Sequence, residues 1–128
     1  MNPNYMAGSV FIGLRMIDRE NIERGTPVLF RCGDEIYVKR IIGLSGETVS
    51  FTCGVVYIDG AILDESAYLD ASVKTESDKE AFRVPNGYYL LLGDNRPESY
   101  DARHWDDPYT PADDIIGQIL YAIKIRRY

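Results

Sequence analysis

The chain has 128 residues, of which 45% are hydrophobic and 27% charged, a composition typical of one globular domain. Its 14 basic and 20 acidic side chains give a net charge of -6, which argues against binding to nucleic acid. No apolar stretch in the sequence reaches the roughly 18 residues needed to cross a bilayer. We therefore expect a single domain over residues 1–128 with no nucleic-acid partner.

Strand signals dominate the first half of the chain. Short runs of β-branched and aromatic residues alternate there with turns that contain glycine. The pairs Cys53-Gly54 and Asp59-Gly60 are typical of tight hairpin turns. Strands are predicted at residues 10–17, 27–31, 36–44, 48–52, 55–58 and 62–63.

The second half alternates between polar segments and strands. Residues 64–80 are acidic and show no sustained apolar period, which predicts a surface excursion with one helical turn, to which we assign no catalytic role. Residues 94–114 predict a long polar loop, and loops of this length in small domains tend to be functional. Further strands are predicted at residues 82–84, 88–92 and 115–125, the middle one buried on both faces.

Cys32 and Cys53 are the only cysteines, and His104 is the only histidine. Unpaired cysteines are among the most often buried residues, so we expect two small buried side chains, with one disulfide as the alternative. Three such residues do not make a structural zinc site or a Cys-His dyad. We expect neither a metal nor a cofactor.

Lys39 lies in a predicted strand, where alternation places it on one face with Tyr37 and Ile41. A strand lysine commonly sits at a solvated edge with its ammonium in water. The alternative is a desolvated amine, because burial penalises the charged form and lowers the lysine pKa. A neutral amine can activate a hydroxyl nucleophile without a histidine. Since His104 is a lone loop residue, a Ser-Lys pair is a better candidate than a Ser-His-Asp triad.

A cluster of acids and arginines follows the predicted strand at residues 88–92. These charges could simply solvate a turn. Alternatively, they form ion pairs that hold the loop rigid and bring Ser99 beside the Lys39 amine. Those pairs would join Asp94 and Asp101 to Arg40 and Arg103.

Four motifs occur in a definite order and spacing. Residues 37–49 read YVKRIIGLSGETV, 56–60 read VYIDG, 84–89 read VPNGYY and 93–103 read GDNRPESYDAR. Together they resemble the bacterial type I signal peptidases over nearly the whole chain. The Lys-Arg strand and the Gly-Asp-Asn-Arg loop, found together, are the most specific part of the resemblance.

The resemblance implies a mostly-β fold of coiled antiparallel sheets with short helical turns. It also implies a serine endopeptidase that removes signal peptides from exported preproteins. Such an enzyme is held in the cell membrane by an N-terminal anchor outside this chain, with its catalytic domain on the extracytoplasmic face. Lys39 is similar in position to the family's general base, and Ser99 to the serine that orients the lysine. The supports of the site map onto Arg40, Asp94, Asn95, Asp101 and Arg103.

The family's nucleophile opens a Ser-Met-x-Pro motif, whose last three positions match Met1, Asn2 and Pro3. The serine would immediately precede Met1, and its backbone N–H would form part of the oxyanion hole. We therefore expect the polypeptide of residues 1–128 alone not to turn over substrate. The resemblance also places Met1, Pro3 and Tyr37 in contact with the substrate.

Two other functions stay open. Asn4, Tyr5 and Ser9 depart from the family's usual residues, which leaves room for an assembly factor that binds secreted or pilin precursors without cutting them. A residue other than serine before Met1 would favour that function, whereas the presence of Lys39 and Ser99 argues against it. A generic β-barrel recognition module would be favoured if Lys39 and Ser99 lay far apart.

Overall fold

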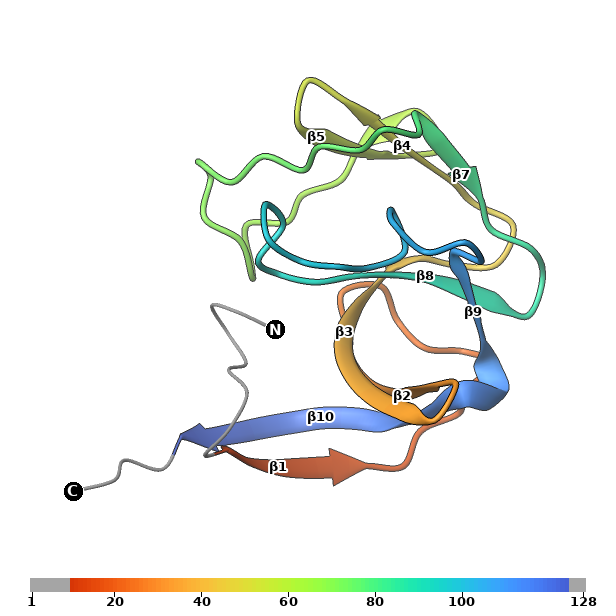
Figure 1. The fold of residues 1–128 in the computed structure, drawn as a ribbon, viewed down its shortest axis with the longest axis vertical. Helices are drawn as coiled ribbons and strands as arrows, with labels where there is room; N and C mark the ends of the chain where they lie inside the picture. The colour runs from red at the N-terminus through yellow and green to blue at the C-terminus, as the bar shows by residue number, and fades with distance from the viewer. Residues whose placement is uncertain (1–9, 125–128) are drawn as a thin grey trace.

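The computed structural model describes residues 10–124, and over this range the chain forms ten strands and one short 3-10 helix in two antiparallel sheets (Figure 1). The prediction of a mostly-β fold built from antiparallel sheets is confirmed. No helix in the described range is long and apolar enough to cross a membrane.

The larger sheet has six strands, each antiparallel to its neighbours. β3 curves strongly between its two neighbours (Figure 1), and its register against β8 shifts between Ile41 and Gly43. A Cβ on Gly43 would lie 2.7 Å from Val49 and 2.9 Å from Leu90, so a glycine is needed where this strand passes between the sheets. In spatial order the strands are β1 (Val10–Arg15), β10 (Ile115–Lys124), β2 (Pro27–Cys32), β3 (Glu35–Gly43), β8 (Tyr88–Leu92) and β9 (Tyr109–Pro111).

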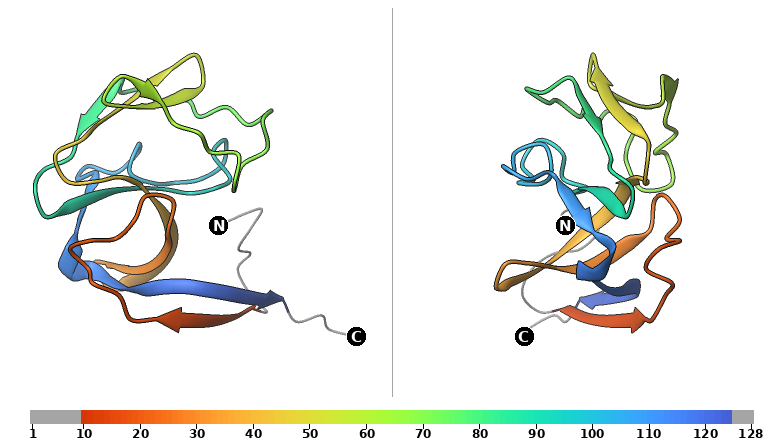
Figure 2. Two further views of the ribbon diagram at one scale, coloured as in Figure 1. Left: turned by 180° about the vertical axis from the view of Figure 1, so that it is seen from behind. Right: turned by 90° about the vertical axis from the view of Figure 1, so that its right-hand side faces the viewer.

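The smaller sheet has four strands and lies at one end of the molecule, the top of Figure 1; Figure 2 shows it from two further sides. Both predicted hairpin turns are present, and their central residues have the positive φ that such turns require. Cys53 and Gly54 have φ of 51° and 78°, and Asp59 and Gly60 have φ of 50° and 85°. The strands are, in order, β6 (Ala61–Ile62), β5 (Val55–Ile58), β4 (Thr48–Thr52) and β7 (Ala81–Arg83).

One core cluster joins the two sheets and a second fills the larger one. The half-buried Trp105 packs against both clusters. The joining cluster contains Ile42, Leu90 and Leu92 from the larger sheet and Val49, Phe51, Val56 and Phe82 from the smaller. The second includes Val28, Phe30, Ile41, Leu91 and Ile115.

The predicted loop at residues 94–114 contains two elements that the sequence analysis missed. β9 and the 3-10 helix η1 (Ala112–Asp114) occupy its last part. β9 pairs with the free edge of β8, where Leu90 faces Tyr109. Elements of three residues are too short to show an apolar period, so only pairing in three dimensions reveals them. The last predicted strand is confirmed up to residue 124, and Ile125 lies outside the described range.

The expectation of two buried cysteines is wrong, and so is the alternative of a disulfide. Both cysteines are free and exposed. Cys32 ends β2 at the hairpin to β3, and Cys53 lies in the turn between β4 and β5. Their position at hairpin turns decides their exposure, and it overrides the general preference of cysteine for the interior.

Candidate functional site

Lys39 and Ser99 meet at the surface of the larger sheet. Lys39 belongs to β3 and Ser99 to the loop after β8, and the Lys39 Nζ donates a hydrogen bond to the Ser99 Oγ across 3.0 Å. Burial lowers the pKa of Lys39 below its usual 10.5, while the charge of Asp101 opposes this shift and that of Arg103 adds to it. The wide separation that would have favoured a generic recognition module is not found. The pair can therefore offer an amine that loses its proton more readily than an exposed lysine.

Gly93 lies directly against this pair, at the end of β8. A Cβ on Gly93 would overlap the Ser99 Oγ and would lie 2.7 Å from the Ser99 Cβ and 3.2 Å from the Lys39 Nζ. The Gly93 N–H donates to the Asp101 carboxylate across 3.0 Å, and the Gly93 carbonyl accepts from the Arg96 Nε across 2.8 Å. The backbone of Gly93 is thus fixed from both sides. Sequence reasoning used it only as part of a motif, although a glycine between a buried strand and a charged loop is a signal of close approach.

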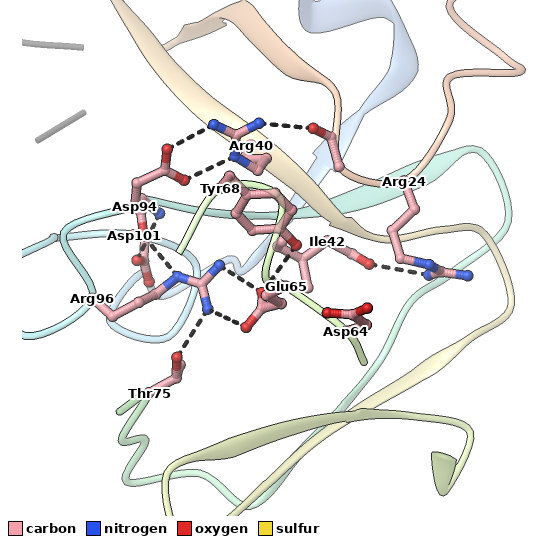
Figure 3. A network of polar contacts seen from close by, with 12 residues as sticks. Arg24, Arg40, Ile42, Asp64, Glu65, Tyr68, Thr75, Asp94, Arg96 and Asp101 are labelled. Carbon is pink, nitrogen blue, oxygen red and sulfur yellow. Dashed lines mark hydrogen bonds and ion pairs between the residues drawn. The ribbon is translucent and has the colours of Figure 1, made fainter. Parts of the chain in front are cut away.

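A buried ion pair joins β3 to the loop beneath the Lys39–Ser99 pair. Arg40 donates through Nε and Nη2 to the two Asp94 oxygens, across 2.9 and 2.7 Å. The two side chains are only 8% and 0% exposed. The Arg40 guanidinium also lies 4.2 Å from the centre of the Tyr68 ring. Figure 3 shows the two side chains next to each other. This is one of the two ion pairs expected from the sequence.

The second expected ion pair lies within the loop itself. Arg103 donates to both oxygens of Asp101, across 2.9 and 2.8 Å, and to the Arg96 carbonyl across 2.9 Å. Burial alone would raise the pKa of Asp101, but the hydrogen bonds from Arg103 and from the Gly93 N–H hold it below 3.8. Asp101 is therefore an acceptor for both groups and a negative charge near Lys39.

The remaining predicted residues lie in different places. Asn95 acts through its backbone, because its carbonyl accepts the N–H of Ser99 across 2.7 Å. Tyr37 is 43% exposed on β3. Met1 and Pro3 lie outside the described residues. Among the described residues, no group of three or more His, Cys, Asp or Glu side chains could hold a metal ion.

Sequence reasoning missed a group of residues that contact the site from the segment 64–80. The Arg96 side chain is 0% exposed and pairs with Glu65 across 2.8 Å. It also donates to the Thr75 hydroxyl across 2.9 Å, and Figure 3 shows Arg96 pointing towards both partners. Arg103 donates to the Glu76 carbonyl across 2.8 Å. The segment expected to be a surface excursion thus contacts the loop that carries Ser99, across separations that no local pattern reveals.

Comparison with known proteins gives consistent matches. The family described as "Signal peptidase, peptidase S26" matches residues 1–123. The "Probable signal peptidase I-2" of Synechocystis sp. is 38% identical over 104 residues, covering 75% of this chain and 45% of that protein. The "Signal peptidase I" of Leptolyngbya laminosa is 42% identical over 87 residues, covering 68% of this chain and 40% of that protein. The chain thus spans less than half the length of these curated relatives.

A solved structure is also similar. The crystal structure of a signal peptidase I from Enterococcus faecalis superposes with a TM-score of 0.62 and 27% sequence identity. The similarity covers 77% of this chain and 96% of that one.

Proposed function

The chain belongs to the bacterial type I signal peptidases, of the peptidase S26 family, and on that premise we propose that it is the catalytic part of a Ser-Lys endopeptidase. Its substrates are the signal peptides of exported preproteins, cut after small residues. The 3.0 Å contact between the Lys39 amine and Ser99 carries this proposal, because it supplies a positioned, partly desolvated base without a histidine.

In the proposed reaction the Lys39 amine takes the proton of a serine hydroxyl as that hydroxyl attacks the scissile carbonyl. The tetrahedral intermediate collapses to an ester, and the Lys39 ammonium returns the proton to the leaving amine. Water, activated by the same lysine, then hydrolyses the ester and frees the serine. Ser99 orients the lysine throughout, and the ion pairs of Arg40 with Asp94 and of Arg103 with Asp101 support the loop.

The nucleophile of this proposal is a serine immediately ahead of Met1. The motif match at Met1 and Pro3 supports that position. A polypeptide of residues 1–128 alone is then inactive, because it lacks the attacking hydroxyl. The proposal also places the domain on the extracytoplasmic side of the cell membrane, where exported preproteins emerge.

The edge of β3 beside Lys39 suits an extended substrate. Within the described residues, the pairing of β8 with β3 covers Arg40, Ile41 and Gly43. No strand among residues 10–124 therefore pairs with the backbone of residues 36–39 on that side. A signal peptide can therefore add there as a further strand, with its side chains at alternate positions meeting the surface around Tyr37.

The test uses a polypeptide in which a serine directly precedes Met1 and several native residues precede that serine. Its substrate is a peptide whose signal sequence ends in Ala-x-Ala, and the assay follows cleavage after this motif. We expect cleavage whose rate rises with pH through an apparent pKa below the lysine value of 10.5, because the neutral amine is the active form. Lys39→Ala should abolish cleavage. Lys74→Ala removes an exposed lysine and should leave the rate unchanged.

Two results would contradict the proposal. Cleavage that persists in Lys39→Ala would exclude the lysine as base. Binding of the peptide without cleavage, in detergent or lipid, would favour the alternative of a non-proteolytic factor that assists the assembly of pilins or secreted proteins.

A further inference from the structure

We propose that Glu65 and Thr75, from the segment 64–80, are positioning residues that hold the Lys39–Ser99 pair in place through Arg96. The inference rests on the proposed function, since it assigns to this segment a part in the same reaction. Each link in the chain of contacts involves a buried or half-buried group.

The first link fixes the guanidinium of Arg96. Arg96 donates through Nη1 and Nη2 to the two Glu65 oxygens, across 3.1 and 2.8 Å, and through Nη1 to the Thr75 hydroxyl across 2.9 Å. A planar guanidinium bound along both of these nitrogens cannot rotate without breaking several charge-assisted bonds. The orientation of Arg96 is therefore set by the segment 64–80.

The second link runs from Arg96 to the reacting groups. The third guanidinium nitrogen, Nε, donates to the Gly93 carbonyl across 2.8 Å. A Cβ added at Gly93 would meet both Ser99 and Lys39, so the backbone there is in contact with the pair. A shift of Gly93 would therefore change the distance or angle between the amine and the hydroxyl.

The third link anchors the segment itself. The Thr75 N–H donates to the Gly54 carbonyl across 2.9 Å, which ties it to the turn between β4 and β5. Glu65 accepts a further hydrogen bond from the Tyr68 hydroxyl across 3.1 Å. Both partners of Arg96 thus have hydrogen bonds that do not involve Arg96, as a positioning role requires.

The test compares four variants of the cleaving polypeptide. Glu65→Gln removes the charge while keeping the shape, and we expect kcat to fall on the order of 10- to 100-fold with KM changed less than about twofold, because misplaced catalytic groups slow the chemical step. Thr75→Val removes the acceptor and should lower kcat about tenfold. Thr75→Ser restores the hydroxyl and should restore kcat. Glu80→Gln makes the same change at an exposed residue of the segment and should leave both constants unchanged.

A second measurement does not depend on cleavage. Hydrogen exchange of the amides in residues 93–103 should be faster in Glu65→Gln and Thr75→Val than in Thr75→Ser and Glu80→Gln. Equal exchange and equal kcat in all four variants would overturn the inference, as would a loss in Thr75→Val that Thr75→Ser does not restore. If the parent polypeptide binds but does not cleave, the proposed function fails, and faster exchange in the two variants still supports the positioning of the loop.

Discussion

The Lys39 amine is subject to two opposing influences, partial burial and nearby carboxylates. Packing against Gly93 and Ser99 takes the amine partly out of water, which disfavours the ammonium form, while Asp101 and Asp94 favour it. The balance lowers the pKa. Keeping a charged lysine partly out of water lowers the stability of the folded state, a cost that is common where side chains are placed for function.

We expect Lys39→Met to be more stable than the parent at neutral pH, with the difference shrinking as the pH rises towards 10.5. The folded state lowers the pKa of Lys39 from 10.5, so at pH values between the two pKa values the unfolded chain binds one proton more. The free energy of unfolding of the parent therefore rises with pH between these two pKa values. Lys39→Met has no titrating group at this position, so its free energy of unfolding lacks this rise. Urea unfolding at several pH values measures the effect.

Lys74→Met is the matched control, because Lys74 is exposed. Its stability relative to the parent should not follow the same pH dependence. A constant difference between Lys39→Met and the parent across the range would contradict a lowered pKa for Lys39.

At the scale of elements, the central feature is the attachment of the loop after β8 to β3. The loop has few backbone ladder bonds of its own before β9, and buried ion pairs take their place. The pair of Arg40 with Asp94 crosses from strand to loop, and Arg40 also donates to the Gly25 carbonyl across 2.9 Å. One guanidinium therefore holds three parts of the chain together.

Asp94→Asn should lower the free energy of unfolding by about 3 to 5 kcal/mol, because it leaves the buried Arg40 charge without its carboxylate. Chemical denaturation measures this loss. Asp18→Asn is the control: Asp18 is exposed and bonds to Asn21, so its loss should stay below about 1 kcal/mol. Equal effects of the two substitutions would show that the Arg40–Asp94 pair does not fix the loop.

At the scale of the whole molecule, one core cluster contains residues of both sheets. β3 leads from the larger sheet directly into β4 of the smaller one, and Trp105 packs on both clusters. A single domain over the whole chain stays a prediction, and this shared core supports it. Sheets that share a core should unfold together.

Phe82→Ala tests this cooperativity. Phe82 is 3% exposed in the smaller sheet, with its ring against Phe51, and we expect a loss of about 3 to 5 kcal/mol. Trp105 fluorescence and the circular dichroism of the sheets should report the same lowered midpoint. Ile62→Ala, at a residue 68% exposed in the same sheet, should cost far less. Separate midpoints for the two signals would indicate two independent units.

The sequence by itself determined what depends on neighbouring residues. Alternation and β-branched composition placed most strands, and the Cys53-Gly54 and Asp59-Gly60 turns were predicted because positive φ at such pairs is a local property. The motifs around Lys39 and Ser99 could also be identified from the sequence. The contact expected between the two residues is present. Their catalytic roles stay predictions.

Only the tertiary structure decided what depends on partners far along the chain. It exposed both cysteines, paired β9 with β8, and brought Glu65 and Thr75 to Arg96 across 31 and 21 residues. The segment 64–80 showed no apolar period because its contacts with the site are polar and come from single side chains. Hydrogen bonds and ion pairs between distant residues leave no periodic pattern in a sequence, whereas burial of a strand face does.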